Sequence, residues 1–331
     1  MEKVSKQDFQ EKRKKKRKLI FKRIRLLFIV TAVVLLGWNV RSFFVPVADS
    51  LNKDLLLRMG VDGNKESFEA SPPDEDTVAR INPQDMEFLK KDLEEYIKKY
   101  NGKYGIYYYN LADGSEFGIN HEEEYSAAST IKIPLNIYLY EKIKSGEVDP
   151  QETLTYLQED YEEGTGTIRY EKVGKKYTLK ELSRLSIVCS DNVAANMLFR
   201  YLGAYNIKQY MREMGGTVVK DDENVSCPKD MGLYMKKVYE FYQKEGALGE
   251  ELMNYFLNTE YNDRIPALLP SDIKVAHKIG TQVRVFNDVG IIYADRPYIL
   301  SIMTKEIDED VAADAIANIS KKVYDYVAVK N

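Results

Sequence analysis

The chain has 331 residues, of which 44% are hydrophobic and 30% charged, a composition that is ordinary for a globular protein with a sizeable core. Residues 1–25 hold 12 Lys and Arg against three acids, so residues 26–331 carry 36 basic and 49 acidic side chains, a net charge of −13 within the overall −4. An acidic main part excludes a nucleic acid as partner, because binding to its phosphate backbone depends on clustered Lys and Arg.

An apolar stretch follows the basic segment 1–25. Residues 26–40 carry no charge, which is short for a span of about 20 residues, but Arg25 and Arg41 can reach the two membrane surfaces. The positive-inside rule keeps the basic segment in the cytoplasm. The sequence therefore predicts a single-pass anchor at 26–46 in the cell membrane, with the rest of the chain outside the cytoplasm. A cleaved signal peptide is the alternative, but no A-x-A-like cleavage site follows the apolar run.

A linker and the start of a folded domain come next. Residues 47–83 are polar and acidic and show no sustained period, so they are predicted to be a linker outside the membrane. The folded domain is predicted over 84–331. We expect Asp85 to cap its first helix, because apolar residues recur at helical spacing from Met86 to Tyr100.

Strands and then helices are predicted along the first two thirds of this domain. Residues 104–111 and 115–119 have the composition of two strands joined by a turn, which indicates a hairpin. A long apolar helix is expected at 130–143. The region 150–265 has apolar residues at helical spacing, interrupted at Ser190-Asp191-Asn192, which predicts a loop between two helices.

The pattern returns to strands near the end of the chain. Strands are predicted at 273–279, 289–293 and 298–303, and a final helix carries apolar residues from Val311 to Val323 on one side. Strands at both ends of the domain with helices between them indicate an α+β fold. We expect one antiparallel sheet flanked by the terminal helices, with a helical subdomain inserted.

Ser129 and Lys132 are the first candidates for chemistry. Residues three apart on a helix share a face, so the Lys132 amine can approach the Ser129 hydroxyl. A hydroxyl needs a base to become a good nucleophile, and a lysine serves if burial or a neighbouring cation lowers its pKa. The alternative is a helix-capping serine followed by a surface lysine. The helix around Lys132 is apolar nearly all round, which favours burial of this lysine.

Two further short motifs support the first. Ser190-Asp191-Asn192 lies between two apolar helices, and His277-Lys278-Ile279-Gly280-Thr281 lies on a predicted strand, where Gly280 allows close approach of a ligand. Each motif alone also fits an ordinary connection or strand. The only two histidines, His121 and His277, are too few for a metal site built on imidazole and a thin supply for a Ser-His-Asp triad, so another base is needed.

Together the three motifs resemble the S-x-x-K, S-D-N and K-T-G set of class A β-lactamases and penicillin-binding proteins. The flanking residues 127–133 and 177–196 also resemble that family, and the similarity covers roughly 84–331. The resemblance implies a serine hydrolase with a β-lactamase/transpeptidase-like fold. It implies that Ser129 is the acylated nucleophile, that Lys132 is its base or proton relay, and that Ser190 passes a proton to the leaving nitrogen. Asn192 would hold the substrate amide, and Lys278 would bind the substrate carboxylate and lower the pKa of Lys132. The N–H groups of Ser129 and Thr281 would form the oxyanion hole.

The sequence departs from this family at two places. Ile279 stands where the family has Thr or Ser, although Thr281 can supply a hydroxyl nearby. The family's E-x-x-L-N stretch, whose glutamate activates the water for deacylation, is absent, and Glu223 is a candidate replacement in a segment that also fits a solvated turn. The loop 162–167 lies where the family's cleft edge would be, and its glycines indicate mobility, with a plain surface loop as alternative.

The expected reaction is acyl transfer through Ser129 from a β-lactam or a related cell-wall amide. A D,D-carboxypeptidase or transpeptidase acting on peptidoglycan stem peptides is a second hypothesis. A catalytically weak descendant that binds wall peptides or a membrane partner is a third. No metal or organic cofactor is implied. Cys189 and Cys227 can form one disulfide or remain two buried thiols.

Overall fold

The computed structural model describes residues 83–328. The predicted basic tail and membrane anchor lie outside these residues, as does the predicted linker apart from Pro83, so the structure does not test them. Among the helices within 83–328, none combines the length and the apolar character that a membrane span requires.

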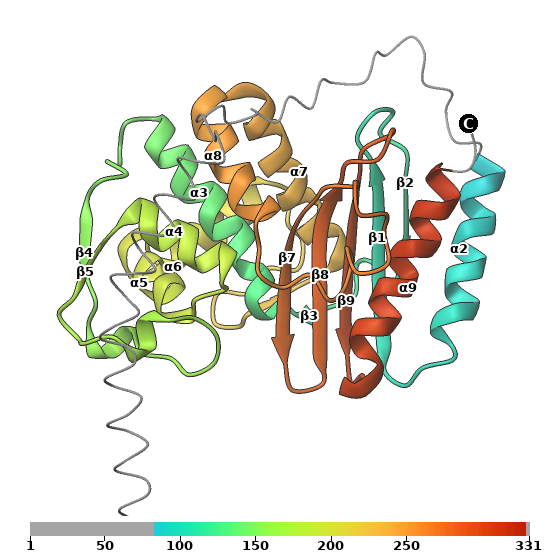
Figure 1. Cartoon of the computed structure of the whole chain (residues 1–331), viewed down its shortest axis with the longest axis horizontal. Helices are drawn as coiled ribbons and strands as arrows, with labels where there is room; N and C mark the ends of the chain where they lie inside the picture. The colour runs from blue at the N-terminus through green and yellow to red at the C-terminus, as the bar shows by residue number, and fades with distance from the viewer. Residues whose placement is uncertain (1–82, 329–331) are drawn as a thin grey trace, which may run out of the picture. The chain divides into compact units, whose positions relative to one another are not determined.

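A five-stranded antiparallel sheet lies at the centre of the domain (Figure 1). Its strand order is β2-β1-β9-β8-β7, so strands from the two ends of the domain pair in the middle of the sheet. In the register of β7 and β8, Lys278 lies opposite Val289 and Gly280 opposite Asn287. The strands are β1 (Lys103–Asn110), β2 (Glu116–Ile119), β7 (Val275–Gln282), β8 (Val285–Ile292) and β9 (Tyr298–Lys305).

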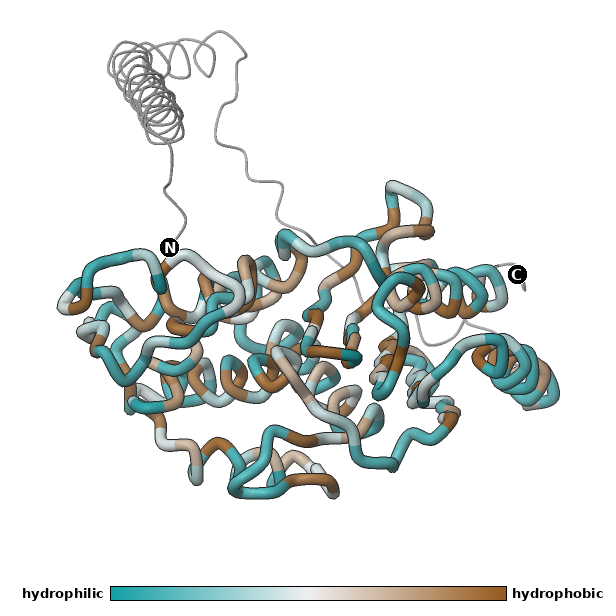
Figure 2. Tube along the Cα trace, turned by 90° about the horizontal axis from the view of Figure 1, so that it is seen from below, coloured by the Kyte–Doolittle hydropathy of each residue, from teal (hydrophilic) through white to brown (hydrophobic). Residues whose placement is uncertain are grey.

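Helices cover both faces of the sheet. On one face, α2 (Pro83–Ile97) and α9 (Glu309–Ala328) lie side by side (Figure 1), and their apolar residues pack on the strands. On the other face, α7 (Pro228–Lys244) and α8 (Gly246–Leu257) pack on the strands. Successive strand residues point to opposite faces of the sheet, and helices cover both faces. Every residue of β9 from Tyr298 to Thr304 is therefore buried. Figure 2 shows the alternation of hydrophilic and hydrophobic positions along the helices that such one-sided packing requires.

A helical subdomain packs beyond α7 and α8. Its central helix α3 (Lys132–Lys144) is buried from Lys132 through Ile137 and packs against the helices around it. The others are α4 (Leu179–Val188), α5 (Asn192–Leu202) and α6 (Ala204–Glu213). The prediction of an α+β fold with an antiparallel sheet, terminal helices and an inserted helical subdomain is confirmed.

Several predicted boundaries are wrong. The first helix begins at Pro83, so Asp85 lies within its first turn and does not cap it. Strand β8 begins at Val285, four residues earlier than predicted, because Asn287 and Asp288 are buried within the strand although their side chains are polar. Polar side chains at such positions look like a strand end in the sequence.

Two short strand pairs were not predicted. Strand β4 (Thr153–Thr155) pairs with β5 (Lys176–Thr178), and β3 (Tyr125–Ser126) pairs with β6 (Val225–Ser226). Strands of two or three residues are too short to show a period of two. The β3–β6 pair is important for the site, because it joins the segment before Ser129 to the segment before α7.

Candidate active site

Ser129 lies in a short 3-10 turn, Ala128–Ile131, that leads directly into α3. The turn brings the Lys132 amine to 3.1 Å from the Ser129 hydroxyl oxygen. Ala128 has φ of +47°, a left-handed conformation that is strained for a residue with a side chain. The Thr130 hydroxyl donates to the Ala127 carbonyl at 2.6 Å, which helps to hold the turn. The structure thus places the serine at the entry of a buried helix with an amine beside it.

Lys132 is almost fully buried, with 3% of its surface exposed. Its amine donates to the Ser190 carbonyl at 2.7 Å, to the Asn192 side-chain oxygen at 2.8 Å and, more weakly, to the Ser190 hydroxyl at 3.3 Å. Burial lowers the pKa of Lys132 to about 8, and the negative charges of Asp191 and Glu162 offset part of this effect. A lysine with such a pKa is neutral often enough near neutral pH to accept a proton from Ser129.

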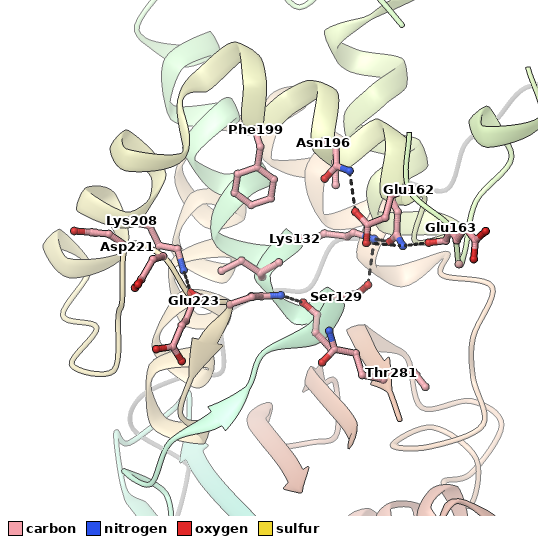
Figure 3. Close-up of a pocket in the computed structure, with 18 residues that line it drawn as sticks. Ser129, Lys132, Glu162, Glu163, Asn196, Phe199, Lys208, Asp221, Glu223 and Thr281 are labelled. Carbon is pink, nitrogen blue, oxygen red and sulfur yellow. Dashed lines mark hydrogen bonds between the residues drawn. The ribbon is translucent and has the colours of Figure 1, made fainter. Parts of the chain in front are cut away.

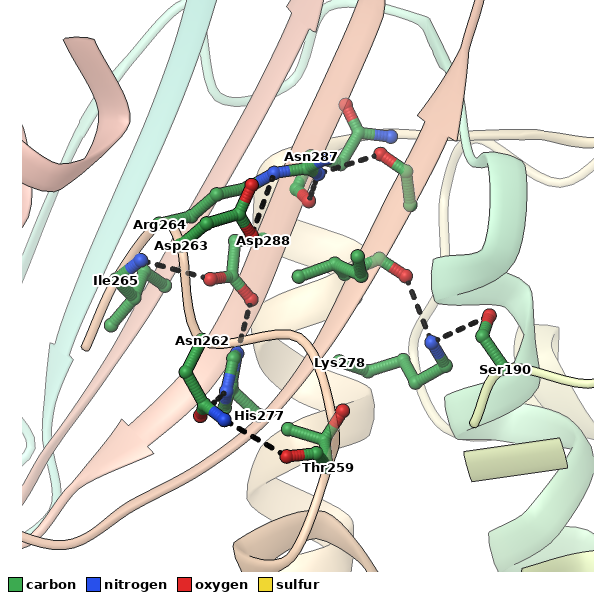
Figure 4. Close-up of polar contacts among 12 residues, drawn as sticks. Ser190, Thr259, Asn262, Asp263, Arg264, Ile265, His277, Lys278, Asn287 and Asp288 are labelled. Atoms are coloured by element: carbon green, nitrogen blue, oxygen red, sulfur yellow. Dashed lines mark hydrogen bonds and ion pairs between the residues drawn. The ribbon is translucent and has the colours of Figure 1, made fainter. Parts of the chain in front are cut away.

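Ser190 connects the two buried lysines of the site. The Lys278 amine donates to its hydroxyl at 2.9 Å and to the Ile279 carbonyl at 3.1 Å (Figure 4). Burial, together with the positive charge of Lys132, lowers the pKa of Lys278 well below its ordinary value. At Lys132, burial is the cause that lowers the pKa. The two amines also disfavour each other's protonation, because like charges repel across the Ser190 hydroxyl that both contact. Ser190 also has a left-handed backbone, with φ of +54°.

Strand β7 passes directly beside the nucleophile turn. A Cβ atom added at Gly280 would lie 2.8 Å from the Ala127 carbonyl oxygen and 3.2 Å from the Ser129 nitrogen, so only glycine fits this approach. The next residue, Thr281, is exposed and lines the same pocket as Ser129. Ile279 is buried, with 6% of its surface exposed. The strand edge therefore offers Thr281, and not residue 279, to the pocket.

Arg264 was missed in the sequence and lies under this strand edge. It is 2% exposed, and its guanidinium donates to the Gly280 carbonyl at 3.0 Å, to the Asn287 carbonyl at 2.6 Å and to the Thr281 hydroxyl at 2.5 Å. It comes from the connection before β7, where the sequence has no period that would mark a buried arginine. Its fixed positive charge lies beside the Thr281 hydroxyl, where an anionic group of a ligand can be bound.

The predicted residues surround a pocket of about 440 Å³ (Figure 3). Ser129, Lys132, Asn192 and Thr281 line it, whereas the side chains of Ser190 and Lys278 are buried behind it. The remaining lining residues are Ala128, Ile131, Glu162, Glu163, Gly164, Ala195, Asn196, Phe199, Lys208, Asp221, Asp222, Glu223, Asn224 and Gln282. Five of these lining residues are acids, whereas the lining lysines are Lys132 and Lys208, so acidic side chains outnumber basic ones around the pocket.

Glu223, the candidate for the deacylating acid, does not meet Ser129 in this arrangement. Its carboxylate pairs with Lys220 at 3.2 Å, and its backbone carbonyl accepts a hydrogen bond from buried Lys208 at 2.8 Å. Figure 3 shows Glu223 and Lys208 across the pocket from Lys132, with the Glu223 carboxylate turned away from Ser129. The neighbouring Asn224 is the structural residue here, because its amide donates to the Ala128 carbonyl at 3.1 Å and steadies the nucleophile turn.

Hydrogen bonds hold the segment 162–168 against the loop that carries Ser190. The segment is closely packed there, whereas its glycines indicated mobility. The Thr165 hydroxyl donates to the Ser190 carbonyl at 2.6 Å. The backbone N–H groups of Thr167 and Ile168 donate to the buried Asp191 carboxylate at 2.6 and 2.9 Å. Glycine is needed at 166 to let the chain pass, since a Cβ there would lie 2.3 Å from the Asp191 carboxyl carbon.

His277 takes a structural place in β7. It is fully buried, with Nδ1 2.9 Å from an Asp288 oxygen and Nε2 3.1 Å from the Asn262 oxygen (Figure 4). The second Asp288 oxygen accepts the Ile265 N–H at 3.0 Å. These contacts tie the connection before β7 to the sheet and so hold Arg264 in place. No cluster of metal-ligating side chains occurs among residues 83–328.

The two cysteines are separate buried thiols. The Cys189 thiol donates to the Leu185 carbonyl at 3.3 Å, and the Cys227 sulfur accepts the Asp230 N–H at 3.4 Å at the start of α7. Burial raises the pKa of Cys227 to about 12. The alternative of one disulfide, which the sequence left open, is not what the structure has.

Comparisons with known proteins agree with this geometry. A family model described as "Beta-lactamase enzyme family" matches residues 88–327. Beta-lactamase 3 of Bacillus cereus is 25% identical over 256 residues, which cover 71% of this chain and 80% of that protein. Beta-lactamase ROB-1 of Haemophilus influenzae is 26% identical over 248 residues, covering 67% and 78%.

Solved structures point the same way. PBP-A superimposes with a TM-score of 0.68 at 25% identity, covering 72% of this chain and 96% of PBP-A. A PBP-A mutant solved as the acyl-enzyme complex with penicillin G gives the same TM-score and identity, covering 73% and 97%. An ancestral class A β-lactamase shares the fold, with a TM-score of 0.66 at 23% identity, covering 72% and 99%. The chain therefore belongs to the beta-lactamase enzyme family and is a serine hydrolase of that kind.

Proposed function

We propose that this protein transfers acyl groups through Ser129, from a β-lactam or a related cell-wall amide, at the outer surface of the cell membrane. The observation that carries the proposal is the hydrogen-bonded series Ser129, Lys132, Ser190, Lys278, whose members come from three separate parts of the chain. A nucleophile, a base of lowered pKa and a second hydroxyl next to a buried amine are the groups that acyl transfer needs.

The acylation step follows from these contacts. Neutral Lys132 takes the proton from the Ser129 hydroxyl as its oxygen bonds to the carbonyl carbon of the substrate amide. The N–H groups of Ser129 and Thr281 donate hydrogen bonds to the oxyanion. Gly280 lets the turn that carries Ser129 and the strand that carries Thr281 approach each other closely. As the carbon–nitrogen bond breaks, Ser190 donates its hydroxyl proton to the leaving nitrogen and receives in return the proton that Lys132 took from Ser129. Lys278 stabilises the charge on the Ser190 oxygen during this transfer.

The substrate class follows from the charges beside Thr281. Arg264 provides a buried positive charge near this strand edge, buried Lys278 provides an amine that can carry a second one, and Thr281 provides a hydroxyl in place of the one that Ile279 lacks. An amide with a carboxylate close to the scissile bond suits this arrangement. Both β-lactams and peptides ending in D-alanyl-D-alanine have that chemistry. Asn192 is the candidate for contact with a second amide of the substrate.

The membrane location is proposed from the sequence. The uncharged run at 26–40 and the basic segment 1–25 fit a single-pass anchor with its N-terminus in the cytoplasm. The catalytic domain would then face the cell wall, where β-lactams and stem peptides occur. Labelling of a cysteine introduced at exposed Val283 by an impermeant maleimide in intact cells tests this orientation.

One experiment tests the reaction. The full chain in detergent is incubated with a chromogenic cephalosporin while product absorbance and intact protein mass are followed, with Ser129→Ala as control. Continuous product release with Ser129 intact supports a β-lactamase, and a lasting adduct supports a penicillin-binding enzyme, for which release of D-alanine from a stem peptide is the second assay. Absence of both adduct and turnover, with the folded protein verified, would refute both enzymatic hypotheses and leave wall binding.

A further inference from the structure

The acyl group on Ser129 is an ester, and its hydrolysis needs a water molecule made nucleophilic by a base. A carboxylate in the pocket is the suitable type of group, provided that it lies beside the catalytic residues and is not neutralised by a cation. Three of the five pocket acids do not meet both conditions, because they pair with a cation or lie away from the catalytic residues. Glu223 pairs with Lys220, Asp221 accepts from Arg212 at 2.6 Å, and Asp222 belongs to the same distant segment.

Glu162 lies on the side of the pocket where Lys132 is (Figure 3). One of its carboxylate oxygens accepts from the Asn196 amide at 2.8 Å, and the other lies 3.3 Å from the Asn192 amide nitrogen. The side-chain oxygen of the same Asn192 accepts from Lys132. Glu162 is therefore one carboxamide away from the base that contacts Ser129, and its negative charge acts on the pKa of Lys132.

The contacts of Glu162 orient its carboxylate without pairing it with a cation. Both of its partners are neutral carboxamides, and each occupies only part of the acceptor capacity of one oxygen, so each oxygen can still accept a hydrogen bond from water. The backbone that carries Glu162 is fixed by Thr165, which bonds the Ser190 carbonyl, and by Asp191. A carboxylate held in this way by a rigid backbone and two amides is preorganised for contact with a bound water.

We propose that Glu162 is the general base for deacylation, taken from the connection between β4 and β5 and not from the segment that contains Glu223. This inference rests on the proposed acylation of Ser129. Glu162 removes a proton from a water molecule as the water oxygen bonds to the acyl carbonyl carbon. The bond from that carbon to the Ser129 oxygen then breaks, and the proton returns from Glu162 to the serine oxygen. The product leaves as a carboxylic acid and the enzyme is restored.

The test compares adduct lifetimes. The full chain and the variants Glu162→Gln and Glu162→Asp are acylated with penicillin G, excess ligand is removed, and the loss of the adduct mass is followed. Glu159→Gln is the matched control, because Glu159 lies three residues earlier on the same segment and pairs with Arg200 outside the pocket. We expect Glu162→Gln to be acylated within threefold of the unmodified rate but to keep its adduct about 10²-fold longer. Glu162→Asp should be intermediate and Glu159→Gln unchanged.

A second measurement separates a missing base from a merely blocked ester. Hydroxylamine attacks esters without a general base, so it should release the adduct from Glu162→Gln as fast as from the unmodified protein. Equal adduct lifetimes in water, an equal loss of acylation and deacylation in Glu162→Gln, or an unmodified adduct that persists for days would each overturn the role of Glu162. Failure of the unmodified chain to form any adduct is a different result, which refutes the acylation of Ser129 itself.

Discussion

The rate of acylation should depend on pH through Lys132. Burial lowers the pKa of Lys132 to about 8, and the active form of this base is the neutral amine. At pH 7 such a lysine is neutral in about one molecule in ten, whereas a lysine at the ordinary value of 10.5 is neutral in about one in 3,000. Burial thus supplies about 300 times more of the active base at pH 7. We expect acylation to rise about tenfold per pH unit below 7 and to level off above pH 9.

The assay is the second-order rate of adduct formation with a β-lactam, measured by quenched mass analysis between pH 5.5 and 9.5. Lys132→Arg, which keeps the charge but cannot lose its proton, should lower the rate by about 10³-fold. Lys142→Arg on the same helix is the control, because Lys142 is a partly exposed residue paired with Glu147 and should keep the full pH profile. A rate that does not change with pH, or a Lys132→Arg variant with more than a tenth of the activity, would contradict the assignment of Lys132 as base.

Three further predictions concern the frame of the site. Gly280→Ala should slow acylation at least tenfold and lower the free energy of unfolding by about 1–3 kcal/mol, because the added Cβ would meet the Ala127 carbonyl. Gly146→Ala is the control: no atom lies within 4 Å of a Cβ added there, so the acylation rate should not change. Arg264→Lys should raise the β-lactam concentration for half-maximal acylation about tenfold by losing the fork of hydrogen bonds, which titration of adduct formation checks. Asp288→Ala should cost about 3 kcal/mol in chemical denaturation, because buried hydrogen-bond partners lose their acceptor; a cost under 1 kcal/mol would contradict this.

The residues that could be predicted from the sequence share two properties. Ser129 and Lys132 are three apart, so the helical period alone predicts their contact, and Ser190 and Lys278 belong to short motifs at a recognisable spacing. The apolar surroundings of Lys132 also predicted its burial. Local spacing and hydrophobic pattern predict the contact of Ser129 with Lys132, and the motifs predict that Ser190 and Lys278 belong to the same site.

The residues that could not be predicted lie outside the three motifs, on segments without a period. Arg264 reaches Thr281 from an irregular connection, and Glu162 reaches Asn196 from a loop. Glycines in that loop suggested mobility, but they serve here to let the chain pass close to Asp191. A glycine in a sequence indicates either freedom or close contact, and only the tertiary structure decides between them.

The two buried lysines make substrate binding and base activation depend on each other. Lys132 and Lys278 both donate to the Ser190 hydroxyl, and the positive charge of Lys132 disfavours protonation of Lys278. By reciprocity, a charge on Lys278 disfavours protonation of Lys132. A substrate carboxylate placed near Lys278 and Arg264 stabilises the cationic form of Lys278. It thereby favours the neutral, basic form of Lys132 next to Ser129, at the moment when the amide to be attacked is in place.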